Sequence, residues 1–336
     1  MADTKKLTRQ RARRILTAAA RHTVLVTGGA MLDQFIWGNV DRISPEAPVP
    51  VVQFKRESFM AGGAANVARN LTSLGCGARM HSVIGRDDAA KKLRTLLKAD
   101  EVDCQPLITD ADRQTSCKTR IIAQRQQVVR VDRETRTDIT PRLAKRLAKS
   151  IDTGLAKSNA IVIGDYGKGV ITQEYLDELK ALGQRHGVCL SLDPKPVHSL
   201  NLRGLSLITP NRKEAFELAG IDDNTYHAQP LKDQNLMRVA KQLLADLELE
   251  VLLITLGDLG MLVCQPGSKP FHIPTLAREV FDVSGAGDTV IGTYTLAVAA
   301  GADPIEAAML ANHAAGVVVG KLGTATVTPK ELLASI

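Results

Sequence analysis

The sequence predicts an α/β fold in which a mostly parallel central sheet is flanked by helices and carries a small β lid. Short runs rich in Val, Ile and Leu alternate with segments of helical periodicity, as in chains built from strand-helix-strand units. Two stretches interrupt this alternation and predict the lid. The length of 336 residues and the hydrophobic content of 44% are sufficient for a large buried core.

The predicted elements follow one another along the chain without an internal repeat. Each strand is a short apolar run, and each helix has apolar residues three and four positions apart. The expected strands are 24–27, 79–84, 160–163, 188–192, 205–208, 251–255 and 261–265. The expected helices are 64–74, 89–97, 141–156, 173–185, 213–218, 231–247, 285–300 and 304–319.

The lid is expected from two segments, at about 35–55 and 104–133. The first is Pro-rich and then extended, and the second contains alternating runs at 119–123 and 128–132 without helical spacing. Ligands of an open parallel sheet bind at the carboxyl ends of its strands. Strands outside the main sheet are therefore expected to cover that edge.

The net charge of +7 is concentrated at the start of the chain. Residues 1–21 hold seven basic side chains against one acidic side chain, which leaves the remaining chain nearly neutral at +1. We interpret 1–21 as a solvated basic helical arm rather than a nucleic-acid or membrane contact, and 22–336 as one domain. No stretch has the features of a signal peptide or of a membrane-spanning helix, so a cytoplasmic location is expected.

Several functional classes lack their motifs. The five cysteines form no Cys-x-x-Cys pair, so neither a disulfide framework nor a zinc site is indicated. The sequence contains no complete phosphate loop, no dinucleotide fingerprint, no His-Glu-x-x-His and no Gly-x-Ser-x-Gly. Aromatic residues make up only 3% of the chain, which argues against a base-stacking nucleic-acid surface.

The string at 281–289, Phe-Asp-Val-Ser-Gly-Ala-Gly-Asp-Thr, precedes a long apolar helix. The free N–H groups and the positive dipole end of a helix N-terminus form an anion site there, and glycine lets phosphate approach the backbone. Asp288 beside this site is explained in two ways. It is either a general base for a hydroxyl that attacks a phosphoryl group, or a residue that caps the helix.

Further polar groups begin helices or follow strands. Asn66 follows the glycine turn at 62–63, where it offers a donor and an acceptor to a hydroxylated ligand. Asn211 and Glu214 lie three residues apart at a helix start, where they form a site for hydrated Mg²⁺ and phosphate, a capping box, or both. Loops 165–169 and 193–195 follow strands and place Lys168, Asp193 and Lys195 at the edge where ligands bind, as candidate substrate contacts; the default alternative for each loop is a solvated surface charge.

Taken in order, these strings resemble the ribokinase-like (PfkB) family of carbohydrate kinases over nearly all of 22–330. The Gly-Ala-Gly-Asp string at 285–288 is the family's signature. The strings at 42–52, 62–68 and 316–324 are similar to those of the bacterial D-glycero-β-D-manno-heptose 7-phosphate kinases of lipopolysaccharide synthesis. The resemblance implies transfer of the ATP γ-phosphoryl group, with Mg²⁺, to the anomeric hydroxyl, which gives a 1,7-bisphosphate on the way to ADP-heptose.

The resemblance also implies roles for individual residues. Asp288 matches the catalytic base, and the backbone of Gly285, Ala286 and Gly287 matches the anion hole. The sugar contacts correspond to Asp33, Gly63 and Asn66. The nucleotide side corresponds to Asn211, Glu214 as a water-mediated Mg²⁺ ligand, Thr255, Gly257 and Asn312, with Asp282 and Ser284 near a site for K⁺.

A sugar phosphate requires cations for its far end. The candidates are Arg120, Arg130, Lys168 and Lys195. The chain departs from the family at Gly29, where relatives usually carry Asp, which removes one expected sugar contact. Val290, by contrast, agrees with the heptose subgroup.

We expect a stand-alone kinase, because the His-x-Gly-His motif of a nucleotidyltransferase is absent from these residues. The resemblance further implies a homodimer formed through the lid strands. The alternatives are another sugar or sugar-phosphate kinase of the same family, a nucleic-acid-binding protein that uses the basic arm, and an inactive sugar-sensing relative.

Overall fold

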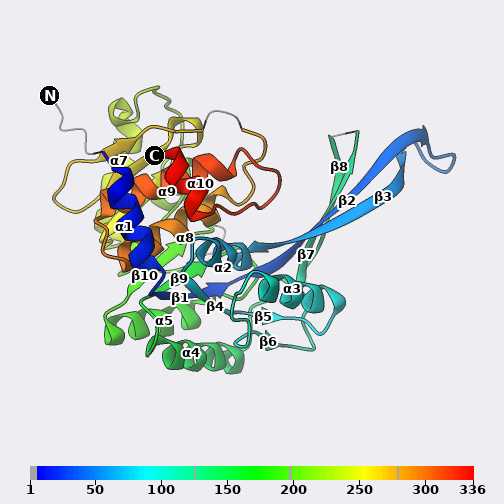
Figure 1. Cartoon of the computed structure of the whole chain (residues 1–336), viewed down its shortest axis with the longest axis horizontal. Coiled ribbons are helices and arrows are strands. Elements are labelled where there is room, and N and C mark those ends of the chain that lie inside the picture. Colours follow the sequence, from blue (N-terminus) through cyan, green and yellow to red (C-terminus); the bar gives the residue numbers. More distant parts are fainter. Residues whose placement is uncertain (1–5, 125, 197–198, 278–279) are drawn as a thin grey trace.

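The computed structural model describes residues 6–124, 126–196, 199–277 and 280–336. An eight-stranded sheet forms the centre of the molecule, with the order β14-β13-β12-β11-β10-β9-β1-β4 (Figure 1). The strands from β12 to β4 run parallel, whereas β13 is antiparallel to both of its neighbours, β12 and β14. The strands are β1 (Thr23–Gly28), β4 (Gly77–His81), β9 (Ala160–Gly164), β10 (Cys189–Asp193), β11 (Leu207–Ile208), β12 (Val251–Thr255), β13 (Met261–Cys264) and β14 (Phe271–Ile273).

Helices cover both faces of this sheet, so the predicted mostly parallel α/β architecture is confirmed. Along β1, Val24 and Val26 belong to one core and Leu25 to the other, which explains the continuous apolar runs. One face packs against α1 (Arg9–Ala19), α2 (Ala64–Ser73), α3 (Asp88–Ala99), α8 (Ala286–Ala299), α9 (Pro304–Val318) and α10 (Pro329–Ser335). The other packs against α4 (Pro141–Leu155), α5 (Gln173–His186), α6 (Arg212–Ala219) and α7 (Gln234–Asp246).

The expected strand at 79–84 is wrong as a single element. The chain leaves the main sheet after His81, and β5 (Val83–Ile84) pairs in parallel with β6 (Ile108–Thr109) in a separate two-stranded sheet. The apolar run continues across this break because both parts are buried. Hydrophobicity alone therefore did not reveal where the pairing changes.

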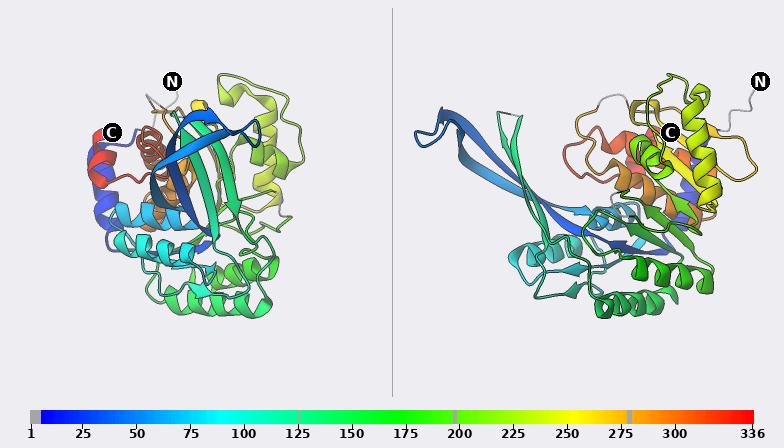
Figure 2. Two further views of the ribbon diagram at one scale, coloured as in Figure 1. Left: turned by 90° about the vertical axis from the view of Figure 1, so that its right-hand side faces the viewer. Right: turned by 180° about the vertical axis from the view of Figure 1, so that it is seen from behind.

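The lid is a four-stranded sheet that extends away from the body (Figures 1 and 2). Its order is β3-β2-β7-β8, in which β2 and β7 are parallel and the other pairs are antiparallel. The hairpin is longer than the predicted 35–55, because its strands extend back into the body at Ala30 and Gly63. The strands are β2 (Ala30–Ile43), β3 (Pro50–Gly63), β7 (Ser116–Ala123) and β8 (Gln126–Arg133).

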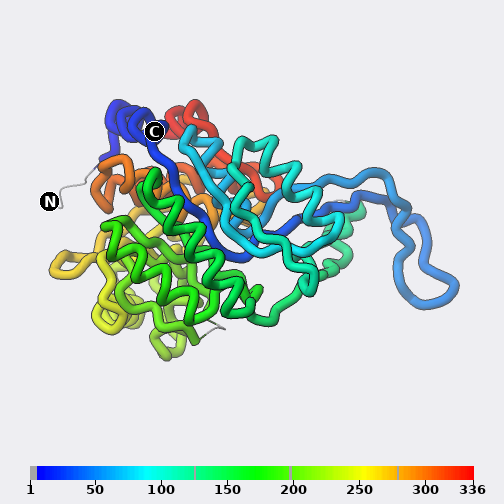
Figure 3. Tube along the Cα trace, turned by 90° about the horizontal axis from the view of Figure 1, so that it is seen from below, coloured from blue at the N-terminus to red at the C-terminus, as the bar shows by residue number. Residues whose placement is uncertain are grey.

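The basic N-terminal segment is helical, as predicted, but it is solvated on one face only. Ala12, Ile15, Leu16 and Ala19 of α1 are buried at the spacing of one helix face. Helix α1 lies beside α10, so the first and last helices of the chain are neighbours (Figure 3). Within the described ranges, no helix has the length and apolarity required to cross a membrane.

Candidate active site

Helix α8 begins at the edge of the body next to the base of the lid. Gly285 is its N-cap residue with φ +79, a left-handed conformation that favours glycine. A Cβ atom on Gly285 would lie 2.6 Å from Nδ2 of Asn66, so glycine also permits the start of α2 to approach. The first-turn N–H groups of α8 and its dipole therefore face the region where α2 and the lid meet, which makes this end suitable for an anion.

Asp288 lies in the first turn of α8 and is 7% exposed. Its Oδ2 accepts a hydrogen bond from Nδ2 of Asn66 at 2.8 Å, and its Oδ1 accepts one from the phenol of Tyr166 at 2.5 Å. Burial raises the pKa of Asp288, while the two donors lower it without cancelling the effect. Asp33 raises this pKa further, and Lys118 lowers it.

Asp288 does not cap its helix with its side chain, because the cap residue Gly285 precedes it and α8 has no side-chain capping bond. Its first-turn position still agrees with the favourable interaction of a carboxylate with the helix dipole. The carboxylate contacts two polar side chains from other elements instead. This arrangement supports the general-base interpretation over the capping interpretation.

Close backbone approach explains the second glycine turn. A Cβ atom on Gly62 would lie 2.2 Å from Oδ2 of Asp33, and Gly63 has φ +57 directly before α2. The turn therefore places Asp33, Asn66 and Asp288 around one region. Oδ1 of Asn66 is buried without a hydrogen-bond partner in the described part of the chain, and an unpaired buried acceptor of this kind is suited to a ligand hydroxyl.

The lid contributes a row of charged residues to this region. Strand register pairs Asp33 with Lys118 and Lys118 with Asp132, so the three side chains share a face. The next row pairs Phe35 with Arg120 and Arg120 with Arg130.

The structure places three of the four expected cations beside this charged face of the lid, each in an ion pair. Arg120 contacts Asp33 at 2.5 Å and Arg130 contacts Asp132 at 2.8 Å. Lys168 pairs with Glu134. Lys195 lies elsewhere, because its Nζ is 3.2 Å from Oε1 of Glu214.

A separate cavity of about 780 Å³ lies beside the start of α8. It contains the residues expected on the nucleotide side and is bordered by the first turn of α8. Nδ2 of Asn312 donates to the carbonyl of Pro274 at 2.8 Å, which orients this buried amide. The lining includes Asp193, Asn211, Glu214, Thr255, Gly257, Ala286, Gly287 and Asn312.

Asn211 and Glu214 form a complete capping box on α6. Oδ1 of Asn211 accepts from the N–H of Glu214 at 3.0 Å, and Oε2 of Glu214 accepts from the N–H of Asn211 at 3.0 Å. Both residues nevertheless line the cavity. The expected capping box is thus formed, and it leaves Oε1 of Glu214 free to accept a hydrogen bond from Lys195.

Asp193 connects the two regions at the end of β10. A Cβ atom on Gly287 would lie 3.9 Å from its Oδ2, and Thr209 donates to its Oδ1 at 3.1 Å. Burial raises the pKa of Asp193 well above its usual value, and the nearby carboxylates of Glu214 and Asp288 raise it further. Hydrated Mg²⁺ beside these carboxylates stays a prediction, because among the described residues no three acidic, His or Cys side chains are grouped closely enough to hold a metal ion directly.

Asp282 connects the anion turn to the segment after α9. Its carboxylate accepts from the N–H of Ser284 at 2.9 Å and from the N–H of Gly323 at 3.0 Å. Burial raises the pKa of Asp282, but these hydrogen bonds outweigh burial and lower it overall. The contacts establish a role in holding the turn, whereas the role of Asp282 and Ser284 in binding K⁺ stays a prediction.

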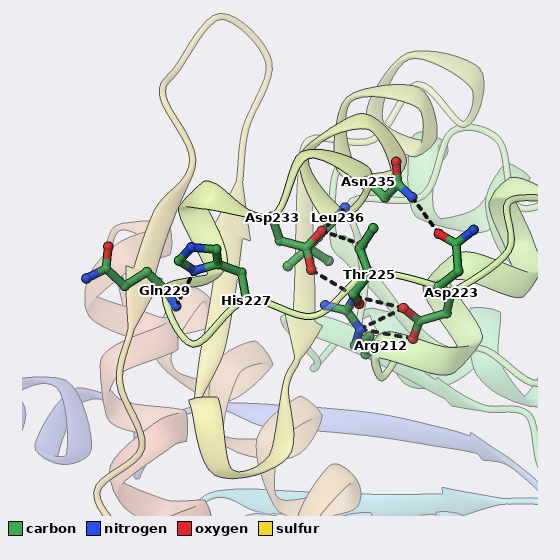
Figure 4. A network of polar contacts seen from close by, with 9 residues as sticks. Arg212, Asp223, Thr225, His227, Gln229, Asp233, Asn235 and Leu236 are labelled. Atoms are coloured by element: carbon green, nitrogen blue, oxygen red, sulfur yellow. Dashed lines mark hydrogen bonds and ion pairs between the residues drawn. The ribbon is translucent and has the colours of Figure 1, made fainter.

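Arg212, next to Asn211, organises the polar network shown in Figure 4. Its guanidinium contacts Asp223 at 2.7 Å and Asp233 at 2.9 Å and donates to the carbonyl of Thr225 at 2.5 Å. Asp233 is the N-cap of α7. The network therefore joins the starts of α6 and α7 beside the cavity.

The residue-level predictions omitted Tyr166 and Lys118. The loop that contains Tyr166 was noted because it follows a strand, but nothing local indicated its contact with a residue 122 positions away. Lys118 had a detectable signal, since it lies two residues before Arg120 and therefore on the same face of an alternating strand.

Comparisons with known proteins show the family and the fold. A model of the pfkB family of carbohydrate kinases matches residues 21–331. A protein named bifunctional protein HldE from Geotalea uraniireducens is 44% identical over 322 residues, which cover 96% of this chain and 64% of that protein. A protein of the same name from Geobacter sulfurreducens is 42% identical over 312 residues, which cover 93% of this chain and 62% of that protein. The chain thus spans less than two thirds of the length of these relatives.

Among solved structures, Arabidopsis thaliana ribokinase complexed with ribose and ATP has a TM-score of 0.73 and 18% identity, over 94% of this chain and 98% of that chain. This likeness confirms the ribokinase-like fold. Together with the match over 21–331, it shows that the chain belongs to the pfkB family of carbohydrate kinases.

Proposed function

We propose that this protein transfers the γ-phosphoryl group of ATP to the anomeric hydroxyl of D-glycero-β-D-manno-heptose 7-phosphate, forming the 1,7-bisphosphate. The observation that carries the proposal is the position of Asp288, which is buried at an anion-binding helix start between the charged lid face and the 780 Å³ cavity. The resemblance of 42–52, 62–68 and 316–324 to heptose 7-phosphate kinases supports the choice of sugar.

In the proposed reaction, Asp288 accepts the proton of the sugar hydroxyl as the hydroxyl oxygen attacks the γ-phosphorus. The bond from the γ-phosphorus to the bridging oxygen breaks, and ADP leaves with the electron pair. The first-turn N–H groups of α8 stabilise the charge on the transferred group. Asp33, Gly63 and Asn66 position the sugar, and Thr255, Gly257 and Asn312 line the cavity proposed for the nucleotide.

Asp193, Asn211 and Glu214 are the residues that would hold hydrated Mg²⁺. The ion supplies charge neutralisation for the ATP phosphates. Lys195, which pairs with Glu214, is placed to contact the phosphate groups on this side. Asp282 and Ser284 remain the proposed neighbours of a K⁺ ion.

The lid face supports a substrate that carries its own phosphate. Lys118, Arg120, Arg130 and Lys168 all lie near the sugar side, and three of them are paired with carboxylates. Burial lowers the pKa of Lys118, and neighbouring Lys168 and Arg130 lower it further, while Asp33 and Asp132 raise it. A phosphate group would be attracted by Lys118 and would relieve the repulsion that Lys118 experiences from Lys168 and Arg130.

The test is ATP consumption with Mg²⁺ and heptose 7-phosphate, unphosphorylated heptose, or a panel of other sugars and sugar phosphates. Phosphorus NMR identifies the product. We expect the 1,7-bisphosphate from heptose 7-phosphate only. Turnover of another sugar alone would replace the heptose assignment by the second candidate, a different sugar kinase of the pfkB family. A cytoplasmic location and a stand-alone kinase also stay predictions.

A further inference from the structure

We propose that Tyr166 is a positioning residue for this reaction, whose phenol holds the Asp288 carboxylate ionised and correctly oriented. This inference rests on the proposed function, in which Asp288 accepts the proton of the sugar hydroxyl. The observation behind it is the contact of 2.5 Å between the Tyr166 hydroxyl and Oδ1 of Asp288, across two elements far apart in the chain.

The carboxylate of Asp288 is held at both oxygens. Tyr166 donates to Oδ1 and Asn66 donates to Oδ2, so the plane of the carboxylate is fixed by side chains from two different elements. Each carboxylate oxygen has a second lone pair. The two donors therefore orient the base and still leave it able to accept a proton from a sugar hydroxyl.

Toward the ionised carboxylate of Asp288, the phenol of Tyr166 can act only as a donor. Burial raises the pKa of Tyr166 well above its ordinary value, and Asp288, Asp193 and Asp165 raise it further. The hydroxyl consequently keeps its proton throughout the pH range in which kinases operate. A permanent donor to a buried carboxylate favours the ionised form, which is the form that a general base requires.

The surrounding backbone is shaped to admit the ring. A Cβ atom on Gly164 would lie 2.5 Å from Cε2 of Tyr166, and a Cβ atom on Gly29 would lie 3.4 Å from its Cβ. Gly164 therefore leaves space for a ring whose only polar atom contacts Asp288, whereas the Gly29 distance is an ordinary contact with the Cβ atom of Tyr166.

Other charged groups near Asp288 act in opposite directions. Asp33 and Asp193 disfavour its ionisation or share its negative field, whereas Lys118 favours ionisation. Tyr166 is the strongest of the groups that favour the ionised form of Asp288. Removing this donor should therefore be visible as a shift in the acidic limb of the pH profile.

The experiment compares Tyr166→Phe with Tyr175→Phe. Tyr175 is fully buried and its hydroxyl lies 2.8 Å from Oγ1 of Thr27, so the control removes one buried phenol at a site remote from Asp288. In Tyr166→Phe we expect the acidic limb of kcat to move up by about one pH unit, so that kcat on that limb falls about tenfold relative to the parent at the same pH. The KM for ATP should remain within twofold, and Tyr175→Phe should keep the parent profile.

A second variant tests the position of the Tyr166 phenol rather than its presence. Gly164→Ala retains the phenol but displaces the ring, and we expect it to shift the acidic limb in the same direction as Tyr166→Phe. An acidic limb in Tyr166→Phe that coincides with that of the parent would overturn the inference.

A readout independent of activity separates this inference from the proposed function. The carboxyl ¹³C resonance of Asp288, assigned by its loss in Asp288→Asn, is titrated in the parent and in Tyr166→Phe. We expect a higher midpoint in the variant even if no sugar is phosphorylated. Equal midpoints would refute the role of Tyr166, whereas absence of kinase activity with every sugar would refute only the proposed function.

Discussion

Asp288 illustrates how a buried acid is kept available as a base. Burial favours its neutral form, and the hydrogen bonds from Tyr166 and Asn66 favour the anion. The balance leaves the pKa above its ordinary value but dependent on both donors. At the scale of the residue, therefore, activity should depend on single polar atoms around this carboxylate.

Asp288→Asn keeps the shape of the side chain and removes its ability to accept a proton. We expect kcat to fall by about 10²- to 10⁴-fold, the usual contribution of a general base. Nucleotide binding, measured by calorimetry, and the thermal midpoint should stay close to those of the parent. A variant that retains a kcat within threefold of the parent value would exclude Asp288 as the base.

His81 is a second buried titratable residue, remote from the proposed chemistry. It is fully buried, and neither ring nitrogen has a hydrogen-bond partner in the described part of the chain. Burial lowers the pKa of His81 from its ordinary value of 6.5 to about 4, and neighbouring Arg79 contributes to this decrease. The folded state thus holds a neutral imidazole where the unfolded chain binds a proton.

This difference predicts a loss of stability in acid. The contribution is fully present above pH 6.5 and is lost as the pH falls toward 4, because the unfolded state binds more protons in that window. The loss should reach about 3 kcal/mol. Urea unfolding of the parent and of His81→Leu at pH 7.5 and pH 4.5 measures it, and equal pH dependence in the two proteins would contradict the assignment.

At the scale of the element, the helix starts position the site. Gly285, Gly63 and Asn211 each begin a helix that faces the ligand regions. The start of α6 is joined to the start of α7 through Arg212 and the side chain of Asp233, which is fully buried. Burial raises the pKa of Asp233, but hydrogen bonds and Arg212 lower it overall.

Arg212→Met should disrupt this connection. It removes the cation from a buried carboxylate, and we expect the free energy of unfolding to fall by about 2 kcal/mol. The KM for ATP should rise, because α6 lines the cavity. Arg203→Met is the matched control, since its ion pair with Glu248 is exposed and should contribute less than about 0.5 kcal/mol. Similar losses in both variants would argue against the network.

Helix α1 provides a second test at this scale. Its apolar face packs into the main core, and Arg11 forms an ion pair with Glu306 at 2.8 Å, next to the turn between α8 and α9. Ile15→Ala should lower the free energy of unfolding by about 3 kcal/mol, because Ile15 is 1% exposed. Arg14→Ala on the exposed side should change it by less than about 0.5 kcal/mol. Equal effects would mean that the helix is solvated, as the sequence alone predicted.

At the scale of the whole molecule, the lid projects from the body with several apolar side chains exposed. Ile43, Phe54, Val129 and Val131 are 60%, 63%, 46% and 47% exposed. Apolar groups on the strands of a small sheet favour pairing with another sheet. This supports the proposal of a homodimer formed through the lids.

Phe54→Asp should weaken such a dimer by placing a charge in the interface. Sedimentation velocity should show a dimer for the parent and a shift toward monomer for the variant at the same concentration. Tyr226→Asp is the control, because Tyr226 is 69% exposed and lies outside the lid. A parent that sediments as a monomer, or a Phe54→Asp variant as dimeric as the parent, would contradict the proposal.

Much of the fold could be predicted because hydrophobic burial acts locally. The helices α4, α5 and α9 differ from their predicted ranges by one residue at one end, and α8 differs by one residue at each end. The break between β4 and β5 could not be predicted, and neither could the burial of one face of α1. Both depend on which distant surface the apolar residues contact. Amphipathic spacing in α1 was present in the sequence but was outweighed by its charge.

The sequence by itself determined the fold class, the order of the elements and the glycine turns that carry Asn66 and Asp288, because backbone preferences and periodicity are properties of neighbouring residues. Only the tertiary structure decided which cations and donors meet. Lys195 was expected beside the sugar and pairs with Glu214, and Tyr166 was assigned no role and contacts Asp288. Contacts of this kind depend on how strand ends converge at one edge of the sheet. The number of residues between two side chains in the sequence does not indicate how far apart they lie in the folded protein.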